Sequence, residues 1–190
     1  MAGRLLQLLL GGWSVQGTLP DHKKYVIIIA HHTSNWDFVN ALGAKLVLGV
    51  HLRFFGKHSL FVGPLGWLMR ALGGIPINRG HAHQRVEQAI RAMQSQEEFI
   101  LAIAPEGTRS KVKRWKSGFY YIAEGAKVPI VPVAIDYANR QIVLGEPTYT
   151  TGDKSTDFRT LHQFFLPYQP KRPELGCNGP FDPVKPDNPV

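Results

Sequence analysis

Apolar and polar positions alternate along the chain in two patterns, which predict strands and helices in turn. Unbroken runs of apolar and β-branched residues predict buried strands, and shorter runs predict further strands. The predicted strands are 25–30, 52–56, 75–78, 99–104, 130–135 and 141–144. Apolar residues at helical spacing predict helices that begin near residue 35 and cover 83–94, 119–126 and 155–166. Strands that alternate with helices indicate an α/β fold, and we expect a mixed, mostly parallel sheet flanked by helices.

One segment, from Phe61 to Leu72, is apolar on most sides of the helix that it would form. Such a helix is either deeply buried or in contact with lipid. Neither this segment nor the apolar stretch 38–52 reaches the roughly eighteen uninterrupted apolar residues of a membrane span. The leucine-rich stretch 5–10 is shorter than the apolar region of a signal peptide. We therefore expect neither secretion nor a spanning helix, and attachment to a membrane surface at most.

The composition supports a single domain that attracts anionic partners. A chain of 190 residues with 44% hydrophobic residues can form one substantial core. Its 22 Lys and Arg against 14 Asp and Glu give a net charge of +8, which favours nucleic acid, anionic headgroups and phosphorylated cofactors. We expect the domain to cover residues 1–166, and the proline-rich residues 167–190 to form an extended or disordered tail. The single cysteine, Cys177, supports neither a disulfide framework nor a thiol nucleophile.

His32 and Asp37 are the first candidate pair for chemistry. Ser34 and Asp37 form a capping-box pattern, which places His32 on the loop ahead of a helix and Asp37 in its first turn. There the carboxylate can accept from one imidazole nitrogen while the other faces outward as a base. On this spacing alone, a loop histidine beside a helix-capping aspartate is the alternative interpretation.

A second candidate is the turn at residues 105–110, which contains Arg109 and follows a predicted buried strand. Loops at the carboxyl ends of strands carry ligand sites in α/β proteins, and a guanidinium fork matches the oxygens of a phosphate. Residues 109–116 also contain five positive charges around Trp115, which favours a phosphate-bearing partner. The two motifs together indicate a base that activates a hydroxyl on a phosphorylated substrate.

These motifs resemble the four sequence blocks of the glycerophospholipid acyltransferase family, which includes the lysophosphatidic acid acyltransferases. The blocks lie at 32–37, with the family's HxxxxD pattern, and at 74–79, 105–110 and 128–133. They occur in the family's order within residues 25–135, and four ordered blocks are more specific than any single one. The resemblance implies a glycerolipid acyltransferase-like fold and an O-acyltransferase activity.

The resemblance also implies roles for individual residues. His32 would be the general base and Asp37 would hold its tautomer, so that the acceptor hydroxyl attacks the thioester directly without an acyl-enzyme. The implied substrate-binding residues are Arg79, Glu106, Gly107, Thr108 and Arg109, and Lys57 is a further candidate for thioester or phosphate contact. The donor would be acyl-CoA or an acyl carrier protein, and the acceptor a lysophospholipid or glycerophosphate. We expect no cofactor, no metal, no nucleic acid, and a location at the cytoplasmic face of a membrane.

Two departures from the family pattern concern Asn78 and His31. Asn78 stands before Arg79 where the family usually has an acidic residue, which leaves the identity of the acceptor open. His31 stands before His32 where the family often has asparagine, and the spacing to Asp37 assigns the base to His32. Two other functions also remain open on the sequence: a non-catalytic basic module that binds nucleic acid, and a thioester hydrolase that uses the same histidine on water.

Overall fold

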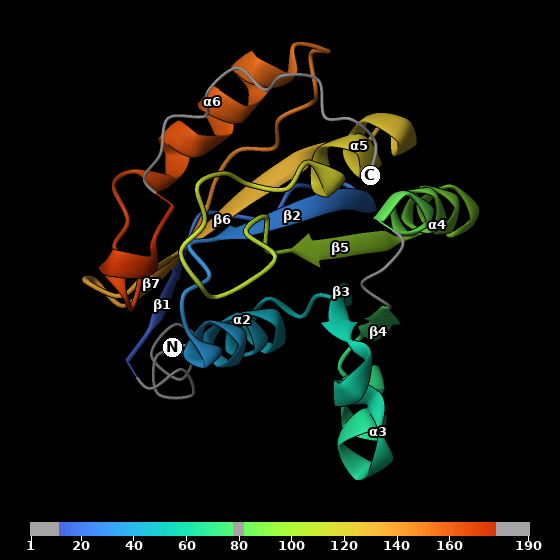
Figure 1. Cartoon of the computed structure of the whole chain (residues 1–190), viewed down its shortest axis with the longest axis horizontal. Helices are drawn as coiled ribbons and strands as arrows, with labels where there is room; N and C mark the ends of the chain where they lie inside the picture. Colours follow the sequence, from blue (N-terminus) through green and yellow to red (C-terminus); the bar gives the residue numbers. More distant parts are fainter. Residues whose placement is uncertain (1–11, 78–81, 178–190) are drawn as a thin grey trace.

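The computed structural model describes residues 12–77 and 82–177, which form one sheet with helices on both faces. The strands are β1 Ser14–Gln16, β2 Lys24–Ala30, β3 Leu52–Lys57, β4 Gly74–Ile77, β5 Phe99–Ile103, β6 Ile130–Asp136 and β7 Gln141–Leu144. Their order across the sheet is β1-β7-β6-β2-β5-β3-β4 (Figure 1). β6 and β7 are antiparallel, and all other neighbouring strands are parallel. The prediction of a mixed, mostly parallel sheet is confirmed.

Helices cover the two faces of the sheet unequally. They are α2 Asn35–Leu48, α3 Gly63–Ala71, α4 Ala82–Ser95, α5 Gly118–Ala126 and α6 Lys154–Phe165, with short 3-10 helices η1 His58–Phe61 and η2 Pro173–Leu175. α4, α5 and α6 pack on one face, α2 lies on the other, and α3 projects beyond the edge formed by β3 and β4 (Figure 1). The alternation of side chains along β2 fits this arrangement, because Val26 and Ile28 belong to the first core and Tyr25 and Ile27 to the second.

The predicted elements agree with the observed ones to within a residue or two at each end. The exception is β1, which the sequence did not predict. Its three residues are too few for a periodic pattern, and two of them, Ser14 and Gln16, are polar. Pairing with the distant strand β7 forms it instead. The last residue of the predicted strand 75–78 lies outside the described residues.

α2 begins and ends where its sequence specifies. The Ser34 side chain accepts from the Trp36 N–H, and the Asp37 carboxylate accepts from the Ser34 N–H, so the predicted capping box is present. Gly49 ends the helix with φ at 65°, a left-handed conformation that glycine adopts without steric cost. Asp37 is thereby fixed in the first turn of the helix.

The chain after α6 packs against the domain. The Tyr137 N–H donates to the Gln169 carbonyl at 2.8 Å, and the Arg172 N–H donates to the Thr33 hydroxyl at 3.3 Å. Cys177 is fully buried. An extended tail therefore does not describe residues 167–177. The predicted domain boundary at residue 166 stays a prediction, and residues 178–190 lie outside the described part of the chain.

Candidate active site

Parallel strands bring the sequence motifs to one edge of the sheet. β6, β2, β5, β3 and β4 are neighbours and all point the same way, so their carboxyl ends lie along one edge. His32 follows β2 by two residues, Glu106 follows β5 by three, and Tyr137 directly follows β6. Lys57 is the last residue of β3. This edge is where α/β folds bind their ligands, because the loops there differ most freely from the scaffold.

His32 and Asp37 form the pair that the sequence predicted. The His32 Nδ1 lies 3.3 Å from the Asp37 Oδ2, the aspartate side chain is buried, and the histidine side chain is 19% exposed. Because Nδ1 faces the carboxylate, Nε2 is the nitrogen left for a substrate hydroxyl. The structure thus brings both side chains together, and their catalytic roles stay predictions.

Asp37 is held as a carboxylate by donors on several sides. Its Oδ2 accepts from the backbone N–H groups of Thr33 and Ser34, each at 2.7 Å, and its Oδ1 accepts from the Tyr137 hydroxyl at 2.7 Å. Burial alone would raise the pKa of Asp37, but the hydrogen bonds from His32, Tyr137 and Ser34 outweigh it and lower that pKa below its ordinary value. The carboxylate therefore faces His32 in its charged form.

Glu106 and His31 lie beneath the loop that carries His32 rather than at its surface. The Glu106 carboxyl is buried, and its Oε1 accepts from the His32 N–H at 3.3 Å. His31 is also buried, with its Nδ1 3.9 Å from that same oxygen. Burial raises the pKa of Glu106 to about 7 and lowers the pKa of His31 to about 4. His31 is therefore neutral at pH 7 and has no access to substrate, which agrees with the choice of His32 as the base.

We expect Glu106→Gln to change how stability depends on pH. The folded-state pKa of about 7 exceeds the ordinary value of 4.5, so the stability that protonated Glu106 contributes is full below pH 4.5 and is lost as pH rises through 7. The loss amounts to about 3 kcal/mol. The free energy of unfolding is measured in urea between pH 4.5 and pH 8, and in the variant it should not show this decline. If the free energies of wild type and variant fell in parallel with pH, the expectation would be wrong.

His31→Asn is the matched control, because its effect has the opposite sign. The pKa of His31 is lowered from 6.5 to about 4, so its contribution is present above pH 6.5 and is lost as pH falls toward 4. This variant should therefore remove an acid-side decline and leave the alkaline side unchanged.

Four further predicted substrate-binding residues lie at the same edge and are exposed: Gly107, Thr108, Arg109 and Lys57. Gly107 has φ at 64°, so the turn after β5 requires a glycine there. The Thr108 hydroxyl accepts from the Ser110 N–H at 3.3 Å, and Arg109 is exposed. Lys57 is also exposed, at the end of a strand two positions away from β2, which places its backbone roughly 10 Å from that strand.

Arg79 and Asn78 lie outside the described residues, so the second sequence block is represented only by β4. The fourth block forms β6, a buried strand that pairs with β2 on one side and β7 on the other. Its backbone N–H groups thus belong to the sheet. The strand that begins in this block places Tyr137 at the edge.

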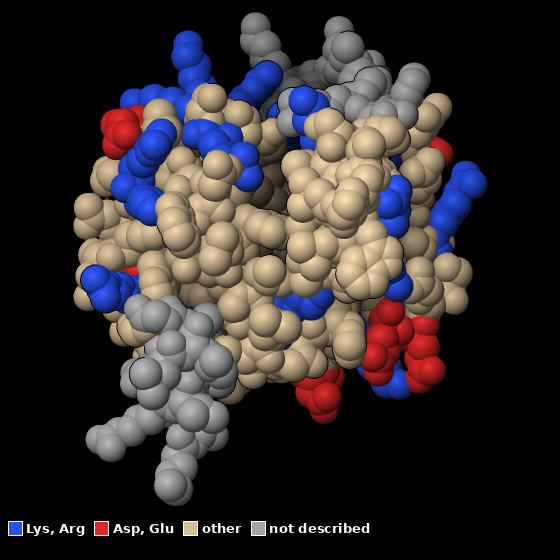
Figure 2. All heavy atoms as spheres, turned by 90° about the horizontal axis from the view of Figure 1, so that it is seen from below, with Lys and Arg blue, Asp and Glu red and all other residues tan. Residues whose placement is uncertain are grey.

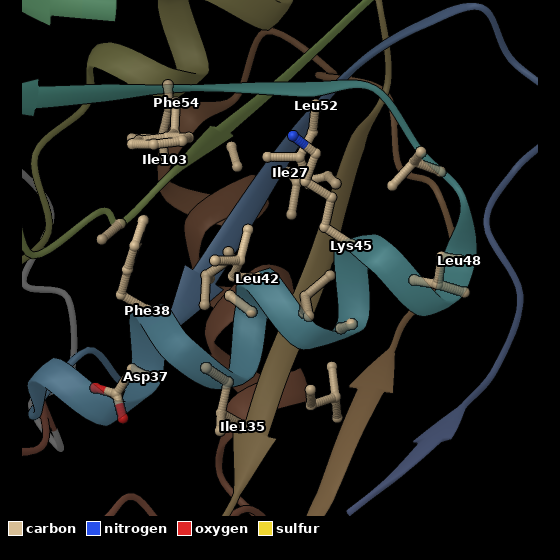
Figure 3. A pocket seen from close by; sticks show the side chains of 18 of the residues that line it. Ile27, Asp37, Phe38, Leu42, Lys45, Leu48, Leu52, Phe54, Ile103 and Ile135 are labelled. Carbon is tan, nitrogen blue, oxygen red and sulfur yellow. The ribbon is translucent and has the colours of Figure 1, made fainter. Parts of the chain in front are cut away.

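An apolar cavity of about 160 Å³ extends from His32 and Asp37 beneath α2 (Figure 3). Only three of its lining residues have polar side chains: His32, Asp37 and Lys45. Figure 3 shows Asp37 at one end of α2 and Leu48 at the other, with Leu42 on the side toward the sheet. An apolar cavity near 150 Å³ stays dry and binds small hydrocarbons, so this space is suited to part of an alkyl chain.

Two small residues of α2 leave room for the cavity where the helix faces the sheet. Ala41 and Ala44 both line the cavity, at three-residue spacing between Asp37 and Leu48. Strand residues with larger apolar side chains form the opposite wall. Lys45 closes one side, because its Nζ donates to the Leu72 carbonyl at 2.5 Å. Burial lowers the pKa of Lys45.

Tyr137 and Asn40 are site residues that sequence reasoning missed. The Tyr137 hydroxyl donates to Asp37, and the Asn40 side chain donates to that hydroxyl at 3.2 Å. Burial, and then the bond to Asp37, raise the pKa of Tyr137, so it keeps its proton as a donor. The available signal was its place directly after the strand of the fourth block. No motif marked it, because the contact spans a hundred residues.

Two features are absent from the described residues: a metal site and a membrane-spanning helix. No group of three or more His, Cys, Asp or Glu in residues 12–77 and 82–177 has the arrangement of a metal site. Of the helices that the structure describes, none combines the length and apolar character of a membrane span.

Comparisons with known proteins agree with the sequence blocks. The profile of the family described as Acyltransferase matches residues 14–136. Proteins named 1-acyl-sn-glycerol-3-phosphate acyltransferase from Salmonella typhimurium and Escherichia coli are each 33% identical over 154 residues, which cover 76% of this chain and 60% of the relative. The human protein named 1-acyl-sn-glycerol-3-phosphate acyltransferase beta is 34% identical over 117 residues, which cover 56% of this chain and 40% of that one. The chain thus spans about 60% of the length of its bacterial relatives.

A solved structure shares the fold. The crystal structure of the 1-acyl-sn-glycerophosphate (LPA) acyltransferase PlsC from Thermotoga maritima matches with a TM-score of 0.59 and 20% identity. The match covers 86% of this chain and 76% of that one. At this identity the likeness concerns the arrangement of helices and strands alone.

Proposed function

Because the chain belongs to the acyltransferase family, we propose that it transfers a fatty acyl group from a thioester to the hydroxyl of a lysophospholipid or glycerophosphate-type acceptor. The observation that carries this proposal is the charged Asp37 behind His32, at the end of an apolar cavity and at the carboxyl edge of the sheet. A base, an alkyl-binding space and an exposed arginine turn are the three parts that such a transfer requires.

In the proposed mechanism, His32 is a general base without a covalent intermediate on the protein. Its Nε2 takes the proton of the acceptor hydroxyl as the oxygen attacks the thioester carbonyl, and Asp37 stabilises the imidazolium that forms. The C–S bond then breaks, and the imidazolium returns the proton to the leaving thiolate. The products are an ester and a free thiol, carried by coenzyme A or an acyl carrier protein.

We propose that the acceptor's phosphate lies at the turn after β5. Arg109 is exposed there, and four more exposed cations follow within seven residues: Lys111, Lys113, Arg114 and Lys116. Lys57 at the end of β3 faces the same edge of the sheet. Guanidinium and ammonium groups at this density match phosphate groups of the acceptor or of coenzyme A. Such substrates imply that the protein works at the cytoplasmic face of a membrane, as a peripheral or monotopic protein.

The cavity beneath α2 is proposed to hold the transferred acyl chain, which gives a test by chain length. We expect Ala44→Phe to fill its distal part and to move the preferred donor toward shorter chains. Each buried methylene contributes about 0.8 kcal/mol, so the loss of two would lower turnover of the longest chains about tenfold. Leu46→Phe on the exposed side of α2 is the control. Equal chain-length profiles for Ala44→Phe and wild type would exclude this use of the cavity.

The proposed function is tested by identifying products. The chain is incubated with acyl-CoA or acyl carrier protein donors and with lysophospholipid or glycerophosphate acceptors, and esters are measured by mass spectrometry. Ester formation that requires an acceptor is the expected result. Thioester loss that continues unchanged without an acceptor would indicate a hydrolase. Steeply salt-dependent nucleic-acid binding without thioester consumption would indicate the basic binding module.

A further inference from the structure

Exposed apolar side chains are concentrated on one face of the molecule. Eleven large apolar residues are exposed in the described part of the chain, and eight of them belong to α2, η1, α3 and the residue between the last two. These eight, which we call the α2–α3 surface, are Trp36, Val39, Leu46, Leu60, Val62, Leu65, Trp67 and Leu68. Figure 2 shows this face from below: its centre is hollowed and mostly uncharged, and most Lys and Arg side chains lie around it.

α2 is apolar on both of its sides, which folding of the domain alone does not require. Its inner side lines the cavity through residues such as Ala41 and Ala44. Its outer side exposes Val39 and Leu46, at 51% and 71% of their surface. A helix that is apolar all round is normally buried. The outer side therefore indicates a second apolar environment in contact with α2.

Within the segment that carries the α2–α3 surface, the charged residues are almost all positive. Between residues 35 and 77 the only carboxylate is Asp37, which is buried, whereas the segment contains Lys45, Arg53, Lys57 and Arg70. Lys57 and Arg70 are both exposed. Lys57 lies directly before η1, and Arg70 lies within α3. On the other side, Lys171 Nζ lies 4.9 Å from the centre of the Trp36 ring. Apolar side chains bordered by cations match the interface of a membrane that contains anionic lipids.

α3 is a rigid projection, because Phe61 anchors it to the sheet. Phe61 is 4% exposed and lies against Gly56, Gly66 and Gly74. A Cβ on Gly56 or Gly74 would come within 3 Å of the Phe61 ring, and one on Gly66 would come within 2.2 Å of its backbone. The exposed side of α3 is thus fixed relative to β3 and β4. A convex apolar projection suits insertion into fluid lipid, whereas a protein partner would need a matching groove.

We propose that the α2–α3 surface docks on an anionic lipid membrane, with the Trp67 side of α3 inserted in the interface and Lys57 and Arg70 at the headgroups. This inference rests on the proposed function for its choice of lipid, since the acceptor named for the relatives is itself a lipid. It deepens that function by orienting the site. α2 would lie against the membrane, so the acceptor could reach His32, on the loop just before α2, without leaving the interface.

The test compares Trp67→Glu with Leu166→Glu. Trp67 is 74% exposed on α3, and Leu166 is 60% exposed at the end of α6, on the opposite face of the sheet. Each change adds one carboxylate at an exposed apolar position, so folding should be intact in both, as checked by circular dichroism. Binding is measured by co-sedimentation with vesicles of phosphatidylcholine and phosphatidylglycerol, without substrates. Trp67→Glu should weaken vesicle binding at least tenfold, and Leu166→Glu should change it less than threefold.

Several results would overturn the proposal that the α2–α3 surface docks on a membrane. One is wild-type vesicle binding by Trp67→Glu and by a second variant, Val62→Glu; another is equal weakening by Leu166→Glu. Dimerisation of the wild type that Trp67→Glu abolishes, without vesicle binding, would show that a second copy covers the surface.

A separate assay keeps this test distinct from that of the proposed function. Turnover is measured with a short-chain, water-soluble acceptor in the absence of vesicles. If the wild-type protein transfers acyl groups in this assay but does not bind vesicles, the proposed membrane docking is wrong and the proposed function stands. If vesicle binding depends on Trp67 but no acceptor is acylated, the α2–α3 surface binds lipid and the proposed function is wrong.

Discussion

Replacing His32 with alanine should lower the rate of acyl transfer about a thousandfold, because general-base catalysis by a positioned side chain contributes roughly 10² to 10⁴ in rate. The acceptor hydroxyl would then have no base for its proton, while the cavity and the arginine turn remain. The measurement is single-turnover ester formation with saturating donor. Because the base would act directly on the acceptor, the loss should appear in the chemical step rather than in donor binding.

The fold of His32→Ala should be intact, which makes the kinetic result interpretable. The His32 ring is partly exposed, and its backbone N–H, which donates to Glu106, survives the change. Asp37 retains its bonds from Thr33, Ser34 and Tyr137. His31→Asn serves as a control, since it alters a buried neighbour and should transfer acyl groups at near wild-type rates. Near-normal turnover by His32→Ala would refute the assignment of the base.

The sequence predicted the layout of this site because of a property of parallel sheets. Buried strands in this fold are unbroken apolar runs, and the residues after each one lie at a common edge. His32 and Glu106 follow two such runs, so their proximity could be inferred once the strands were recognised. The pairing of His32 with Asp37 was also predictable, since a capping box between Ser34 and Asp37 places Asp37 in the first turn of α2 and His32 on the loop two residues before the cap.

Contacts between distant segments were beyond sequence reasoning. Tyr137 reaches Asp37 across a hundred residues, and Arg172 reaches Thr33 across an even longer separation. Neither contact leaves a periodic pattern. Proline content predicted an extended or disordered tail over residues 167–190, but burial of Cys177 and the backbone bonds of Gln169 hold its described part, 167–177, on the domain. Composition indicates the conformation that a segment prefers in isolation. Here the rest of the domain supplies the contacts that hold the segment in place.

The cavity and the role of Glu106 depend on packing at a finer scale. Ala41 and Ala44 read as ordinary helix residues in the sequence, and only the distance between α2 and the sheet turns them into the wall of a cavity. Glu106 belongs to a charged motif, which suggested contact with substrate. In the structure its carboxyl is buried beneath the loop that carries His32. Its predicted contact with an acceptor stays untested, whereas its bond to the His32 backbone shows how it orders the loop.

Asp37→Asn should lower acyl transfer by about 10² to 10⁴, for a reason that differs from the loss of the base. The amide has nearly the same shape, but its NH₂ group cannot accept a hydrogen bond and carries no charge. The developing imidazolium of His32 would lose the carboxylate 3.3 Å away, and either Tyr137 or the backbone donors of Thr33 and Ser34 would face a second donor. We also expect the free energy of unfolding to fall by about 1 to 3 kcal/mol near pH 7.

The stability part of this effect should itself depend on pH. The pKa of Asp37 is lowered from 3.8, so the stability that its charged form contributes is present above that value and is lost as pH falls below it. The difference between wild type and Asp37→Asn should therefore narrow below pH 3.8. Urea unfolding at neutral and acidic pH measures it, and a constant difference would show that the carboxylate's charge does not stabilise the fold.

Tyr137→Phe separates the charge of Asp37 from its position. This variant keeps the carboxylate, its contact with His32 and both backbone bonds of the capping loop, and it removes only the hydroxyl donor. Turnover should fall about tenfold, less than in Asp37→Asn, because the carboxylate keeps its charge and its other partners, and a loss of about 1.5 kcal/mol for one hydrogen bond to a charged group corresponds to roughly a factor of ten. If Tyr137→Phe and Asp37→Asn lost the same activity, the orientation of Asp37 by the Tyr137 hydroxyl would matter as much as the charge of the carboxylate. If Asp37→Asn kept wild-type activity, the carboxylate would only cap α2, and the paired mechanism proposed for His32 would be wrong.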